Sequence, residues 1–192
     1  EPLNVLPRNT GNFLEASDYF AEEVRREIAD RYGDDGLYEG GLSVRTTLDP
    51  VLQSHARRAM RNGLEEFDRQ RGWRGATTTI DITQDWGAAL GEVDGLSDIE
   101  EWSLAVVLAV GEDGAQLGLM PPRLASRELS DERPTGFMPA SAMEWAGSNP
   151  SEIVTAGDVI YVRAEPTEAG DVSYSLRQVP EVSGGMVAMD PY

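Results

Sequence analysis

The stretch that most limits the fold of this chain is a strand-and-turn pattern that starts at residue 102. WSLAVVLAV (102–110) is apolar or small at nearly every position, which is typical of a strand buried on both faces. A GEDG turn at 111–114 leads into AQLGL (115–119), which has the length and composition of the returning strand of a hairpin. A buried strand needs hydrogen-bonded neighbours, so we expect an antiparallel sheet here.

A second hairpin pattern lies near the C-terminal end. DVIYVRA (158–164) and VSYSLRQV (172–179) have the composition of strands, and EAGD (168–171) between them has turn composition. The β-prone ATTTIDIT (76–83) adds one more expected strand.

The segments between these strands are less regular. We expect a short helix at 84–90 and an exposed loop at 121–136, and 137–146 fits a short strand or a short helix equally well. About five short strands with a helix between the third and fourth fit a small Greek-key barrel of the OB type. A generic small β-barrel or sandwich fits the pattern nearly as well.

The N-terminal third has a different character. Residues 1–16 contain two prolines and no period, and predict an extended leader. From Ser17 apolar residues recur every four positions up to Gly33, which predicts a helix. LSVRTTL (42–48) alternates as a strand does, and a lone strand needs a sheet from elsewhere to satisfy its backbone.

Asp49-Pro50 is a strong start signal for a second helix, with Asp49 as the cap and Pro50 in the first turn. Its apolar positions continue to about Arg69. The fold class is therefore α+β: a helix–strand–helix linker over 17–75, followed by a small antiparallel OB-like β-barrel over 76–180.

Charge and composition exclude several kinds of chemistry. The net charge is −18. The chain contains no lysine, so its 16 lysine or arginine positions are all arginine, and it also contains no cysteine. A Schiff base, a P-loop lysine, a Ser-x-x-Lys nucleophile, a disulfide and a thiolate metal site are all impossible without those residues. A chain this acidic is repelled by phosphate backbones, so we expect no nucleic-acid partner.

No catalytic, metal or cofactor site is expected from the residues. His55 is the single histidine, and its neighbour Ser54 points about 100° away from it on a helix, so the two do not form a nucleophile–base pair. Ser141 and Glu144 have the spacing of Ser-x-x-Lys with the wrong final residue. The paired acidic residues are better explained as solvated surface; they lie at 22–23, 34–35, 65–66 and 100–101.

The four tryptophans are the remaining candidates for binding. Trp102 begins the buried strand and is expected in the core, and Trp73 lies at the boundary of the barrel. Trp86 and Trp145 are the two that could be exposed and stack on sugar rings, with core packing as the alternative.

Several segments, taken together, resemble the class A penicillin-binding proteins of the 1a type. They occur in the family's order: YFAEEVRREIADRYG (19–33), LYEGGLSVRTTLDPVLQSHARRAM (37–60), RGWRG (71–75), WSLAVVLAV, AGDVIYV and SLRQVPEVSGGMVAMDP. Each motif is modest by itself, and residues 1–16 and 120–150 are the least characteristic.

The resemblance implies a region between two catalytic domains. In such enzymes a membrane anchor and a glycosyltransferase domain come first, and a transpeptidase with Ser-x-x-Lys, Ser-x-Asn and Lys-Thr-Gly motifs follows. An OB-like domain is inserted between the linker and the transpeptidase. This chain contains none of the three motifs. Residues 181–192 resemble the first transpeptidase strand, expected to be frayed or irregularly paired without its sheet.

The expected function is that of a non-catalytic interaction and regulatory module of a peptidoglycan synthase, located in the periplasm, with the parent anchored in the inner membrane. The implied partners are the two catalytic domains and an outer-membrane lipoprotein activator or another periplasmic protein. Binding of peptidoglycan glycan through Trp86 or Trp145 is the alternative. A stand-alone enzyme is the third and weakest hypothesis. No cofactor is expected.

Overall fold

The computed structural model describes residues 17–96, 99, 101–124, 126, 128–167 and 170–189. The expected leader at 1–16, half of the turn at 168–171 and the last three residues lie outside this part. The chain divides into two compact units, Glu1–Gly63 with Gly184–Tyr192 and Leu64–Ser183. Within the described residues, no helix has both the length and the apolar character needed to cross a bilayer.

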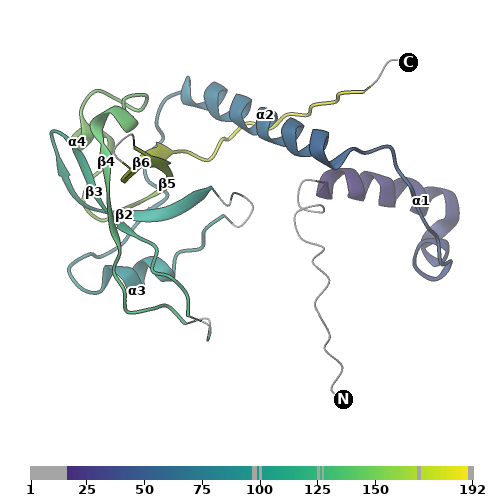
Figure 1. Cartoon of the computed structure of the whole chain (residues 1–192), viewed down its shortest axis with the longest axis horizontal. Coiled ribbons are helices and arrows are strands. Elements are labelled where there is room, and N and C mark those ends of the chain that lie inside the picture. Colours follow the sequence, from purple (N-terminus) through teal and green to yellow (C-terminus); the bar gives the residue numbers. More distant parts are fainter. Residues whose placement is uncertain are drawn as a thin grey trace. The chain divides into compact units, whose positions relative to one another are not determined.

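The first unit contains α1 (Asp18–Glu39) and most of α2 (Pro50–Arg69) (Figure 1). The break predicted at Gly33 is present, since its φ of 73° and ψ of 170° interrupt the helix, but helical structure resumes to Glu39. The start of α2 is confirmed: Asp49 Oδ1 accepts the backbone N–H groups of Val51 at 2.8 Å and Leu52 at 3.1 Å.

Residues 42–48, predicted as a strand that needs a sheet from elsewhere, join no ladder in the described chain. Leu42 and Val44 are exposed, in keeping with the absence of a pairing strand. Residues 184–189 likewise form no strand, as expected for a segment without its own sheet, and Val187 is 80% exposed.

The second unit is built on one antiparallel sheet. Among the described residues of this unit, the sheet has six strands: β1 (Thr78–Thr79), β2 (Trp102–Gly111), β3 (Gly114–Leu119), β4 (Thr135–Pro139), β5 (Asp158–Pro166) and β6 (Val172–Arg177). The order is β1-β5-β2-β3-β4, and β6 pairs with the same edge of β5 as β1, further along the strand. Both predicted hairpins, β2–β3 and β5–β6, are confirmed.

One prediction about the sheet needs correction. Only Thr78–Thr79 of the expected strand at 76–83 joins the ladder. The barrel is not closed by hydrogen bonds, because β4 and β6 are not paired. They approach through side chains instead: a Cβ on Gly136 would lie 2.4 Å from Cε2 of Tyr174, so the Tyr174 ring occupies that space. The result is a partly open barrel of the OB type.

Apolar residues pack on both faces of the sheet, as predicted for 102–110. Successive residues of β2 alternate between two clusters: Leu104 and Val106 join Trp102 and Tyr161, whereas Ala105 joins the second cluster. That second cluster forms the barrel interior and includes Leu117, Met138, Met143, Ile160, Val162 and Leu176. The predicted burial of Trp102 is confirmed at 7% exposure.

Short helices cover each cluster. The helix predicted at 84–90 is present as α3 (Trp86–Gly91), and it contributes the buried Leu90 to the Trp102 cluster. The ambiguous segment 137–146 continues as a strand to Pro139 and then forms the 3-10 turn η1 (Ala140–Ala142). Helix α4 (Pro150–Ile153) packs on the barrel interior, and Figure 1 shows α3 and α4 well apart around the strands.

Candidate functional site

The most strongly built polar site of the second unit surrounds Asp68, in the last turn of α2. This carboxylate is 1% exposed. It accepts Arg74 Nη1 at 3.0 Å, pairs with Arg74 Nη2 at 2.9 Å, and accepts Gln178 Nε2 at 2.9 Å and the backbone N–H of Glu181 at 3.2 Å. We call Asp68, Arg74, Gln178 and Glu181 the junction clamp. It joins the end of α2 to the segment before β1 and the segment after β6.

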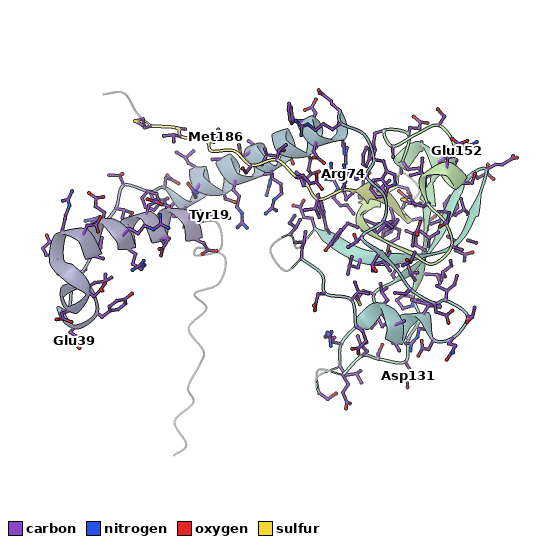
Figure 2. The ribbon with its side chains drawn as sticks, turned by 180° about the vertical axis from the view of Figure 1, so that it is seen from behind. Tyr19, Glu39, Arg74, Asp131, Glu152 and Met186 are labelled. Carbon is purple, nitrogen blue, oxygen red and sulfur yellow. The ribbon has the colours of Figure 1, made fainter. Side chains whose placement is uncertain are left out.

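Further hydrogen bonds hold these two segments side by side. The backbone N–H of Arg74 donates to Gln178 Oε1 at 2.8 Å, and Gln178 Nε2 donates to the Gly72 carbonyl at 3.2 Å. Arg74 Nη2 also donates to the Val179 carbonyl at 2.6 Å. Figure 2 shows Arg74 where α2 ends. The chain therefore enters and leaves the barrel at one fixed point.

The electrostatics of the clamp favour the ionised carboxylate. Burial alone raises the pKa of Asp68, but the hydrogen bonds from Arg74, Gln178 and the Glu181 N–H outweigh it, and the net pKa lies below the ordinary value. The same pairing raises the pKa of Arg74. Asp68 is therefore charged at neutral pH and holds its partners as an anion.

A second polar cluster centres on Arg177, which is 5% exposed. Its Nη2 donates to Glu165 Oε1 at 2.8 Å and to Ser175 Oγ at 3.0 Å, and its Nη1 lies 3.8 Å from Glu65 Oε2. Burial, reinforced by the nearby Arg163 and Arg69 charges, lowers the pKa of Arg177, and the Glu65 and Glu165 carboxylates oppose that shift. The cluster fastens the last turns of α2 to the outward face of β5 and β6.

Trp145 is partly buried and packs against the cluster of the barrel interior. Its ring meets Trp73 edge to face, with centroids 5.8 Å apart, and the Arg69 guanidinium lies 5.1 Å from its centroid. Its Nε1 is buried without a hydrogen-bond partner in the described chain. Trp73 Nε1, by contrast, donates to the Ile153 carbonyl at 2.9 Å.

Trp86 lies elsewhere, on the other apolar cluster, and is only partly buried. Asp85 caps α3 by accepting the N–H groups of Gly87 and Ala88, and Arg133 Nε donates to Asp85 at 2.6 Å. Trp86 and Trp145 thus belong to two separate clusters and do not form one site.

The other candidates from the sequence are not brought together. Ser54 and His55 are exposed on α2 in the first unit. Across the described residues, no group of three potential metal-ligating side chains is clustered.

Asp68 and Arg177 were not predicted from the sequence as site residues. Arg177 has the appearance of an exposed polar position in an alternating strand. Asp68 did carry a signal, because an aspartate in the last turn of a helix opposes the helix dipole and calls for a specific partner.

The topology defines the fold class of the second unit. A meander β2–β3–β4, a helix, and the hairpin β5–β6 form an OB-type barrel. The family follows from the sequence match, because the description "Penicillin-binding protein OB-like domain" matches residues 73–182. The chain belongs to this family, and the matched region begins and ends beside the junction clamp.

Similar proteins agree with this assignment. The chain is 36% identical over 194 residues to penicillin-binding protein 1A of Rickettsia bellii, covering 99% of this chain and 22% of that protein. It is 30% identical to penicillin-binding protein 1A of Vibrio cholerae, covering 97% of this chain and 23% of that protein. A crystal structure of penicillin-binding protein 1A from Haemophilus influenzae superposes with a TM-score of 0.60 at 29% identity, covering 85% of this chain and 22% of the other. The chain thus spans about a fifth of the length of these relatives.

Proposed function

We propose that this chain is a non-catalytic positioning and interaction module of a periplasmic peptidoglycan synthase. The single observation that carries the proposal is the junction clamp, which ties the end of α2 to both ends of the OB-like domain through one buried carboxylate. Such a junction fastens the last turn of α2 to the barrel through hydrogen bonds to a single side chain.

The proposed intramolecular partners are a glycosyltransferase domain and a transpeptidase domain, which the clamp would help to keep in a productive arrangement. The support comes from the similarity to penicillin-binding proteins 1A, of which the chain covers only about a fifth.

A periplasmic protein is the proposed external partner. The net charge of −18 favours a partner with a basic surface, because complementary charge speeds encounter. A periplasmic extract passed over the immobilised chain should yield a partner that high salt releases. Recovery of none at low salt would contradict this part of the proposal.

The positioning role can be tested by removing the barrel from a complete synthase that carries this segment. Because Arg74 and Gln178 hold the two segments side by side, residues 76–176 can be replaced by a short glycine linker. We expect glycan polymerisation and peptide cross-linking each to persist when assayed separately. We expect cross-links per polymerised disaccharide to fall when both are assayed together. An unchanged ratio would contradict a positioning role.

Glycan binding is a second candidate function. It is favoured by the partly exposed Trp86 beside the outward face of β3. Trp145, committed to Trp73 and Arg69, is less suited to it.

A further inference from the structure

We propose that the outward face of β3 and β4 binds the sugar rings of an uncharged glycan. Trp86 and Phe137 are the stacking platforms, and Gln116 is the hydrogen-bonding group between them. This site depends on the second candidate function and gives it a location, a residue set and a ligand class.

The register of the β3–β4 pair places Gln116 and Phe137 on one face of the sheet. Gln116 pairs directly with Phe137, and Gly118 pairs with Thr135. Alternate residues of a strand share a face, so Gln116 and Gly118 of β3 lie beside Phe137 and Thr135 of β4. Gln116 and Thr135 are exposed, and Phe137 is 47% exposed. The face is therefore open to solvent at its centre.

Trp86 borders the same face because Gly118 has no side chain. A Cβ built on Gly118 would lie 2.7 Å from Cζ3 of the Trp86 ring, so the indole lies directly over this glycine. Phe137 is the diagonal cross-strand neighbour of Gly118, and such neighbours are about 7–8 Å apart. The Trp86 ring and the Phe137 side chain therefore belong to the same face of the sheet.

The chemistry of this surface suits a neutral sugar. Its exposed members are uncharged in a chain of net charge −18, and the adjacent Asp85 and Arg133 neutralise each other. The apolar faces of pyranose rings stack on aromatic side chains, while an amide such as Gln116 pairs with hydroxyl or acetamido groups. The overall charge opposes an anionic polymer.

The position in the fold agrees with this assignment. In OB-type barrels, the face of the second and third strands binds oligosaccharides and oligonucleotides. Here β3 and β4 are the second and third strands of the meander β2–β3–β4.

The test is a titration of the whole chain with a tetramer of N-acetylglucosamine, in which binding is measured by calorimetry and by tryptophan emission. We expect saturable binding with a change in tryptophan emission. Phe137→Ala should weaken binding about tenfold, in line with the loss of one stacked ring, and Gln116→Ala should also weaken it. Val172→Ala is the matched control, because Val172 is also exposed, on β6.

The three substitutions are at exposed positions, and equal thermal midpoints will show that the variants are folded. No saturable binding by the wild-type chain overturns the proposal. Equal affinity of the wild type, Phe137→Ala and Gln116→Ala also overturns it, as does tighter binding of a single-stranded oligonucleotide than of the sugar. The positioning role survives any of these results, because removal of the barrel tests it independently.

Discussion

Replacing Asp68 by asparagine should destabilise the second unit substantially. The amide has nearly the same shape but no charge, and it turns one acceptor into a donor facing Arg74 or Gln178. Breaking a buried ion pair costs about 3–5 kcal/mol. Arg74 retains 30% side-chain exposure and its bond to the Val179 carbonyl, so solvent offsets part of this loss, and we expect about 2–3 kcal/mol.

The assay is urea unfolding at pH 7, followed by tryptophan emission. Asp81→Asn is the matched control: Asp81 is exposed, and the Thr83 hydroxyl and backbone N–H lower its pKa, so it shares the charge but not the burial. We expect the midpoint of Asp81→Asn to stay near that of the wild type. Equal midpoints for Asp68→Asn and the wild type would refute the view that the clamp stabilises the junction.

The pH dependence gives a second check on Asp68. Folding lowers the pKa of Asp68, so its carboxylate stabilises the folded state. This stabilisation is fully present above the ordinary aspartate pKa of about 3.9, and it is lost as the pH falls through the lower pKa of the folded state. The stability difference between wild type and Asp68→Asn should therefore be constant from pH 7 to about 5 and shrink below about 4. A difference that persists unchanged at low pH would contradict this account.

Two other substitutions test the barrel. Gly136→Ala places a Cβ against the Tyr174 ring and should lower the free energy of unfolding, measured by calorimetry, by about 1–3 kcal/mol. Gly63→Ala is the control: this glycine lies in a helix with open space around it, and the substitution should raise the free energy of unfolding by up to about 1 kcal/mol. Equal effects of the two substitutions would contradict the close approach of β4 and β6. Arg177→Met should lower the free energy of unfolding by about 1–2 kcal/mol. The loss is modest because Glu165 keeps Arg163 as a partner. A higher free energy of unfolding would show that the buried guanidinium destabilises the fold.

Local sequence signals predicted much of the fold. Asp49-Pro50 marks the start of α2, and the GEDG turn sets the β2–β3 register, because both depend on neighbouring residues. The strand predicted at 42–48 depends on more than its own residues: alternation shows that a segment can be a strand, but a ladder requires a partner, and the described chain offers none to this segment.

The site was harder to predict because its members are distant in sequence. Asp68 and Gln178 are 110 residues apart, and no local pattern pairs them. Trp86 was identified as a candidate, but Phe137 and Gln116 became its neighbours only through the β3–β4 register and the bare backbone of Gly118.

The most direct test of the central claim is to measure cross-links per polymerised disaccharide in a complete synthase carrying Asp68→Asn, with Asp81→Asn as the control. Amide hydrogen exchange at residues 72–74, 178, 179 and 181 would verify that the junction has loosened. We expect a lower ratio for Asp68→Asn alone, with each separate activity retained. A loosened junction with an unchanged ratio would contradict it.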